Sequence, residues 1–194
     1  MDSTVAARIW KVRSQSLETL DLSYCFPEGD EESSGVLDEV FGLTQLKELD
    51  LSGNGIGKIS AKVSSLQALQ CLNLSGNRLR SLPEEISELS ELDTLRLLGN
   101  PLGSVPEWIA ILPHLKCLSL GSRESASFPD WIGRMRNLRE LTLANCKSLP
   151  DWLFGMVWLT SLGLGGNELE DLPEWLFQLG RVHTNLNAST ISAK

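Results

Sequence analysis

The segment Leu69–Glu91 reads LQCLNLSGNRLRSLPEEISELSE, and its spacing of leucines decides the fold. Leu72 and Leu74 alternate with polar residues, so both point to one side of a short strand. Asn77 comes where this strand ends, and its amide can both donate to and accept from the backbone of a turn. Pro83 has the fixed φ that suits the first position of a short helical turn. The segment therefore predicts one coil, made of a strand, a turn and a short helical return.

The same unit recurs along most of the chain. Its first residues are Leu17, Leu46, Leu69, Leu92, Leu115, Leu138, Leu159 and Val182. One unit alone cannot bury enough apolar surface to offset the entropy of ordering it, so stability must come from stacking on its neighbours. We therefore expect an α/β solenoid curved like a horseshoe. A parallel β-sheet should line its concave face, and short helical or 3-10 turns should line its convex face.

The chain is expected to form a single domain over residues 1–194. Residues 2–14 have helical periodicity and predict an N-terminal capping helix. Seven repeats occupy 17–181, and the first contains an acidic insertion at 27–35, either a projection for a basic partner or a solvated loop. Residues 182–194 form a degenerate last repeat and a polar tail. This tail is either a frayed end or a sign that the chain stops inside a longer protein.

Asparagines recur at the end of the predicted strands, where they should form a ladder through Asn54, Asn77, Asn100 and Asn167. The ladder is interrupted at Arg123 and Cys146, in two adjacent irregular units. Such irregular units between 121 and 150 are either sequence drift or a functional site.

Composition limits the functional classes. The chain has 194 residues and a formal net charge of −8, which argues against a nucleic-acid-binding surface. It contains no run of 18 apolar residues, so we expect no membrane span. The opening residues lack the apolar segment of a secretory signal. The four cysteines, Cys25, Cys71, Cys117 and Cys146, are interpreted as free thiols in a reducing, cytoplasmic compartment.

Four successive turns begin with proline, an acidic residue and tryptophan. The tryptophans are Trp108, Trp131, Trp152 and Trp175. Earlier units carry Lys62 or Glu85 in the same slot, so the slot cannot be fully buried. The four tryptophans could form a half-exposed ribbon that mediates an interface, including self-association, or they could shield the turns beneath them.

The concave face is the expected surface for binding a partner, because solenoids present an open sheet there. Its candidate residues are polar and of both charge signs: Glu48, Asp50, Asn73, Arg96, Lys116, Ser119, Arg139, Glu140 and Thr142. For any one of them, a solvated strand residue is the simpler interpretation. No catalytic or metal-binding motif occurs in the sequence, so neither an enzyme activity nor a cofactor is expected.

The L-x-x-L-x-L-x-x-N-x-L pattern resembles a leucine-rich repeat, of the 23-residue intracellular type. The helix that runs into LETLDLS at residues 17–23 is similar to the start of bacterial Roco-type repeat domains. Bacterial effectors delivered into host cells carry similar arrays. The resemblance implies a protein-interaction scaffold without a cofactor. The alternative to a scaffold is that these repeats form the substrate-recognition arm of a larger enzyme, either a Roco-type GTPase or an effector ubiquitin ligase.

Overall fold

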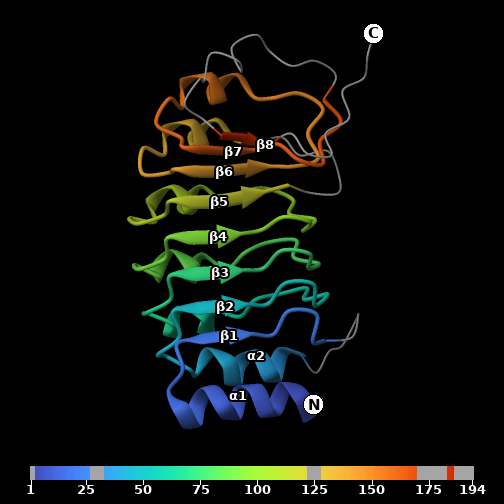
Figure 1. Ribbon diagram of the computed structural model, residues 1–194, viewed down its shortest axis with the longest axis vertical. Helices are drawn as coiled ribbons and strands as arrows, with labels where there is room; N and C mark the ends of the chain where they lie inside the picture. Colours follow the sequence, from blue (N-terminus) through green and yellow to red (C-terminus); the bar gives the residue numbers. More distant parts are fainter. Residues whose placement is uncertain (1–2, 27–32, 122–127, 170–182, 186–194) are drawn as a thin grey trace.

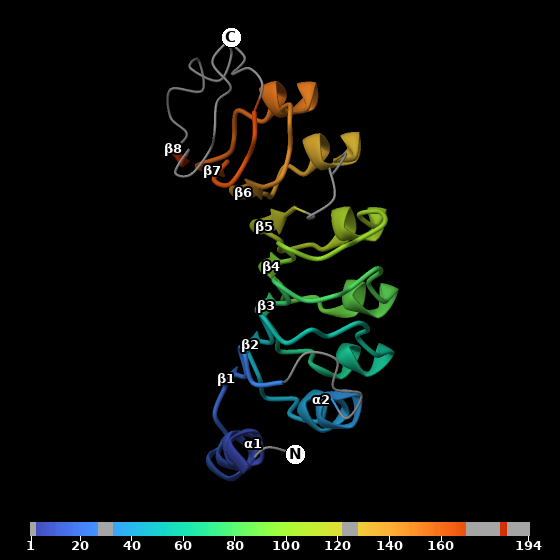
Figure 2. The same ribbon diagram turned by 90° about the vertical axis from the view of Figure 1, so that its right-hand side faces the viewer.

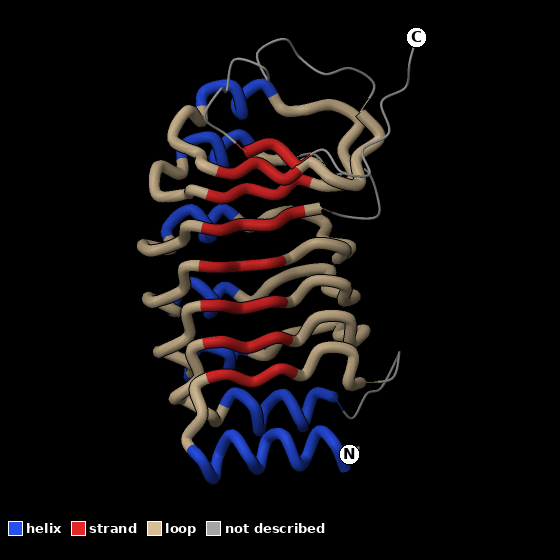
Figure 3. The backbone as a smooth tube through the Cα atoms, in the orientation of Figure 1, coloured by secondary structure: helices blue, strands red, loops and turns tan. Residues whose placement is uncertain are grey.

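The computed structural model describes residues 3–26, 33–121, 128–169 and 183–185. Among these residues, eight strands form one parallel sheet in chain order (Figures 1 and 3). The strands are β1 (Thr19–Asp21), β2 (Glu48–Asp50), β3 (Cys71–Asn73), β4 (Thr94–Arg96), β5 (Cys117–Leu120), β6 (Glu140–Leu143), β7 (Ser161–Gly163) and β8 (His183–Asn185). Seen from the side, the strands lie along an arc whose concave side faces away from the helical turns (Figure 2). The predicted solenoid with its concave parallel sheet is confirmed.

Strand register follows the repeat spacing except at the last strand. Leu49 pairs with Leu72, as the 23-residue spacing requires, and Leu141 pairs with Leu162 across the shortened unit. The predicted start of the last unit at Val182 would pair Asn185 with Leu162. Instead Thr184 pairs with Leu162, so the prediction was wrong by one residue.

The convex face is built from five-residue 3-10 turns. They are η1 (Ala61–Ser65), η2 (Glu84–Glu88), η3 (Glu107–Ile111), η4 (Asp130–Arg134) and η5 (Asp151–Gly155). A proline precedes each turn from η2 onwards, with φ between −65° and −70°. This φ is the one that the pyrrolidine ring imposes, so proline sets the entry into the turn without strain.

Two α-helices close the N-terminal end of the solenoid (Figure 1). Helix α1 (Ser3–Gln15) buries Val5, Ile9 and Val12, as expected for the capping helix. Helix α2 (Ser33–Phe41) takes the place of the first convex turn. It begins inside the segment 27–35 that was expected to be an insertion, because Val36, Leu37 and Val40 bury an apolar face against the core.

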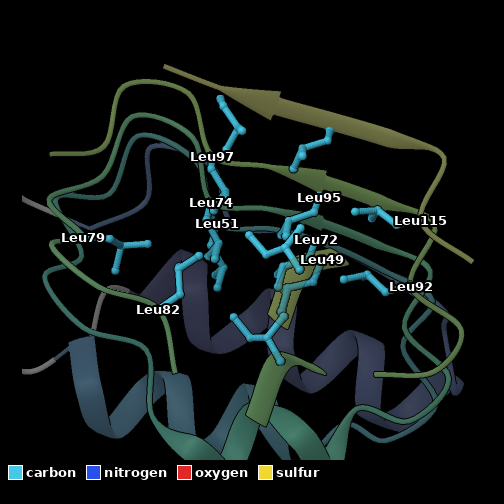
Figure 4. Packing of buried hydrophobic residues seen from close by; sticks show 14 of the residues in the cluster. Leu49, Leu51, Leu72, Leu74, Leu79, Leu82, Leu92, Leu95, Leu97 and Leu115 are labelled. Carbon is cyan, nitrogen blue, oxygen red and sulfur yellow. The ribbon is translucent and has the colours of Figure 1, made fainter. Parts of the chain in front are cut away.

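The core is a continuous stack of leucine columns behind the sheet (Figure 4). Leu49, Leu72 and Leu95 form one column, and Leu51, Leu74 and Leu97 form the next. Each of these six side chains is at most 1% exposed. Each repeat therefore covers the apolar edge of its neighbour, which is why no unit could stand alone.

The asparagine ladder satisfies the backbone at the turn after each strand. Asn77 Nδ2 donates to the carbonyls of Leu51 and Leu74 at 2.9 and 2.8 Å. Its Oδ1 accepts from the N–H groups of Asn54 and Ile56 at 3.1 and 3.0 Å. The side chain thus joins two successive repeats. Asn100 and Asn167 donate to carbonyls of two repeats in the same way.

Candidate functional site

Two columns of outward-facing side chains cover the concave sheet. The first holds Thr19, Glu48, Cys71, Thr94, Cys117, Glu140 and Ser161, paired strand to strand. The second holds Asp21, Asp50, Asn73, Arg96, Ser119, Thr142 and Gly163. Since both columns alternate with the buried leucines, they necessarily point away from the core.

A hollow of about 330 Å³ lies at the N-terminal end of this face. It extends over the first four strands and is lined by Thr19, Leu20, Asp21, Glu48, Leu49, Asp50, Cys71, Asn73 and Arg96. The hollow combines three carboxylates with one guanidinium. Four candidate residues proposed from the sequence, Glu48, Asp50, Asn73 and Arg96, are therefore brought together here.

Two of the three carboxylates in the hollow, those of Asp50 and Asp21, accept short local hydrogen bonds. Asp50 Oδ1 accepts from Ser52 N–H and Oγ at 2.8 and 2.6 Å, and its Oδ2 accepts from Asn73 Nδ2 at 2.8 Å. Asp21 Oδ1 accepts from Ser23 N–H and Oγ at 2.8 and 2.7 Å. These bonds from Ser23, with a smaller effect of Arg8, lower the pKa of Asp21. The two aspartates lie at paired positions on β1 and β2, each held by a serine, and the lowered pKa keeps Asp21 ionised at neutral pH.

Arg96 lies at the centre of the concave face, between two cysteines. The guanidinium interacts with the thiols of Cys71 and Cys117, and Glu140 also contacts Cys117. Burial nevertheless raises the pKa of both thiols. They are therefore mostly neutral at neutral pH and are poor nucleophiles, which fits packing better than redox chemistry. All four cysteines are unpaired in the structure.

Three candidate residues are less available for binding a partner on the concave face than the sequence suggested. Ser119 is only 5% exposed, because its register neighbours Arg96 and Thr142 carry longer side chains that flank it. Lys116 precedes β5 and lies 3.9 Å from the Asp93 carboxylate. Arg139 precedes β6 and donates to the carbonyls of Arg136 and Leu138. Lys116 and Arg139 thus flank the sheet, while Glu140 and Thr142 lie within it.

Small residues towards the C-terminal end of the concave face serve close packing between strands. A Cβ atom added to Gly163 would lie 2.7 Å from Thr142 Oγ1. One added to Gly121 would lie 2.7 Å from the carbonyl oxygen of Ala144. The neighbouring repeat therefore already fills the space beside these glycines, and they need no partner to explain them.

Tyr24 is a surface residue that the sequence interpretation missed. It is 82% exposed, and it occupies the turn position that Gly53, Gly76, Gly99 and Gly166 hold in other repeats. Its φ is 53°, which is unusual for an aromatic residue. Its ring lies over Gly53, where an added Cβ would come within 2.3 Å of it. A tyrosine in a glycine slot was the available sequence signal.

The convex tryptophans are half-buried against the core. This holds for Trp108, Trp131 and Trp152, while Trp175 lies outside the described residues. Trp152 donates its Nε1 proton to the carbonyl of Phe128 at 3.4 Å. A Cβ atom on Gly133 would lie 2.9 Å from Trp152 Cβ, so this ring covers the preceding turn. Trp152 therefore shields a turn, as one of the two interpretations predicts.

Two features are absent from the part of the chain that the structure describes. No group of three or more His, Cys, Asp or Glu side chains there could hold a metal ion. No described helix is long and apolar enough to cross a bilayer.

Comparison with known families identifies the repeats. A leucine-rich repeat region matches residues 72–162, and a second leucine-rich repeat model matches residues 41–102. The chain belongs to the leucine-rich repeat proteins, a fold that generally serves as a protein–protein interaction module and is typically non-enzymatic. A search of curated proteins gave no match.

Several solved structures share the fold. A leucine-rich repeat protein of Leptospira interrogans is 24% identical, with a TM-score of 0.61, over 95% of this chain and 59% of that one. An internalin of Listeria monocytogenes is 20% identical, with a TM-score of 0.56, over 87% of this chain and 58% of that one. Each shows the fold alone, and the chain spans under two thirds of either length.

A plant example is also similar. The ectodomain of a membrane receptor kinase from Arabidopsis thaliana, solved in complex with Casparian strip integrity factor 2, is 28% identical with a TM-score of 0.57. The match covers 77% of this chain and 19% of that one. The similar structures thus include bacterial and plant proteins.

Proposed function

We propose that this chain is a recognition scaffold that binds a partner protein on the concave face of its sheet. One observation carries the proposal: within the described residues no helix or turn covers this face (Figure 2), and side chains of both charge signs line the hollow on it. Charged side chains of both signs favour selective binding of a partner with the complementary pattern. The family's general role in protein–protein interaction supports the same conclusion.

The test compares two double charge reversals that leave the net charge unchanged. Glu48→Arg with Arg96→Glu alters the hollow, while Glu84→Arg with Arg80→Glu alters exposed residues outside the sheet. Proteins captured by each variant are quantified against the wild type. Loss of one reproducible partner with the first variant alone supports the proposal. Equal capture by both variants, with unchanged melting temperatures, would refute it.

The alternative is that these repeats form the substrate-recognition arm of a larger enzyme, a Roco-type GTPase or an effector ligase. The structural relatives, which are longer than the aligned region, are compatible with repeats inside a larger protein. The natural reading frame separates the two possibilities: a GTPase or ligase segment encoded in frame supports the enzyme arm. A natural stop codon at Lys194 would exclude it.

We also propose a cytoplasmic location, either in the producing cell or, after delivery, in a host cell. The four unpaired cysteines support it, because such thiols persist in reducing compartments. Alkylation of intact cells with a membrane-permeant and an impermeant reagent tests this location. Modification of Cys25 and Cys71 by the impermeant reagent would argue for an extracellular site.

Self-association through the convex face is a second candidate function. The turns from η3 to η5 carry the half-buried tryptophans and several exposed apolar side chains. Light scattering of the wild type against Trp131→Glu is the test. A wild-type mass that exceeds that of the variant supports self-association, and equal masses would exclude this route.

A further inference from the structure

Three of the five exposed large apolar side chains among the described residues lie on the C-terminal half of the convex face, while the other two, Trp10 and Tyr24, lie near the N-terminal end. Ile111 at the end of η3 is 70% exposed, Phe154 in η5 is 52% exposed, and Val157 just after η5 is 75% exposed. The two earlier turns are polar at the equivalent positions. Those positions hold Ser64, Ser65, Gln67, Ser87, Glu88 and Ser90. The exposed apolar side chains are therefore a local feature of η3 and η5 and not of the fold, since the turn between them, η4, holds Gly133, Arg134 and Arg136 at the same positions.

Charges of opposite sign border this surface in its central turn. Asp130 is the first residue of η4 and Arg134 is the last. Both side chains are exposed, and the structure forms no ion pair between them. The half-buried Trp131 lies between them in the chain. Across the width of one turn, the surface thus runs from negative through apolar to positive. Glu107 and Asp151 continue the negative border on η3 and η5.

Such a pattern is complementary to itself. A two-fold rotation about an axis parallel to the solenoid keeps the repeats of two copies in step but reverses the direction of each turn. Asp130 of one copy then faces Arg134 of the other, and the reverse pair forms on the opposite side. A two-fold axis along the turns would instead place the acidic borders against each other, which is unfavourable.

We propose that the convex surface from η3 to η5 binds the same surface of a second copy, with Asp130 and Arg134 exchanging ion pairs about that two-fold axis. This inference rests on the self-association proposed above and adds its geometry. Three short turns bury less than the roughly 800 Å² per partner of a standard interface. The net charge of −8 on each copy also opposes association. The dimer is therefore weak and forms at high protein concentration.

The experiment is charge complementation followed by sedimentation equilibrium over a wide range of protein concentration. Arg134→Asp leaves two acidic side chains on each copy, and Asp130→Arg leaves two basic ones. Each variant alone is expected to weaken dimerisation about tenfold or more, because like charges then meet across the axis. An equimolar mixture of the two variants is expected to restore dimers, since both ion pairs can form again in a heterodimer.

Glu84→Arg is the matched control, because Glu84 begins the polar turn η2 as Asp130 begins η4. This variant should dimerise at least as well as the wild type, and melting temperatures verify that all variants fold. If the wild type dimerises but neither single variant is weakened, the proposed axis is wrong while self-association stands. A wild type that stays monomeric at every concentration overturns both proposals.

Discussion

Asn167 Oδ1 accepts two hydrogen bonds from Cys146, one from the backbone N–H at 2.9 Å and one from the thiol at 3.2 Å. Cys146 occupies the slot that asparagine fills in regular repeats. Its sulfur cannot replace the amide, which donates to two carbonyls elsewhere in the ladder. Asn167, in the next repeat, bonds to the backbone of this turn through Cys146 N–H and the Leu143 carbonyl. The ladder therefore continues past the irregular unit.

Because of the ladder, replacing either of two asparagines in the same repeat should lower the free energy of unfolding by different amounts. Asn77→Ala removes four ladder bonds and leaves buried backbone groups without partners, so it should cost about 3 kcal/mol or more of unfolding free energy. Asn73→Ala loses bonds to Ser75 and Asp50 at the surface and should cost about 1 kcal/mol. Urea denaturation of both variants measures the difference. Equal losses would mean that the ladder contributes little.

Close packing between convex turns gives a second prediction. Gly133→Ala places a methyl group 2.9 Å from Trp152 Cβ, so the tryptophan or the turn must move. We expect a cost of about 1–3 kcal/mol, measured by chemical denaturation. Gly155→Ala is the matched control, because nothing lies within 4 Å of an added Cβ in the next turn. A control as destabilised as Gly133→Ala would point to backbone effects in place of steric contact.

Burial of the thiols predicts how stability changes at alkaline pH. Burial raises the folded-state pKa of Cys146 above its ordinary value of 9.0. A folded pKa above the unfolded one contributes stability that is complete below the unfolded pKa and is lost as pH rises through the folded pKa. Cys146→Ala, which has no titrating thiol at this site, should lose less stability than the wild type when pH is raised past 9.0.

Unfolding free energies of both proteins at neutral and alkaline pH give this comparison. The same loss in both would show that ionisation of Cys146 is not responsible for the alkaline destabilisation.

Much of the fold could be predicted from the sequence because leucine spacing alone determines which side chains face inward. Leu72 and Leu74 establish the strand, and Pro83 establishes the turn. The register of β8 could not be predicted, since Thr184 stands where the other strands carry the first leucine of the pair. Ser119 looked like a surface residue because its burial depends on the lengths of Arg96 and Thr142 on neighbouring strands. Tyr24 was overlooked because its left-handed backbone is set by its place in the turn and not by its residue type. Only alignment of the repeats, which puts Tyr24 level with Gly53 and Gly76, reveals this conformation.

Tyr24 provides the last prediction. A left-handed backbone costs roughly 1–2 kcal/mol for a residue with a Cβ atom but not for glycine. Tyr24→Gly and Tyr24→Ala both remove the exposed ring from Gly53, but only the glycine also relieves the strain at φ 53°. Tyr24→Gly should therefore be about 1 kcal/mol more stable than Tyr24→Ala in urea denaturation. If the two variants unfold at the same urea concentration, the left-handed conformation of Tyr24 is not a source of strain.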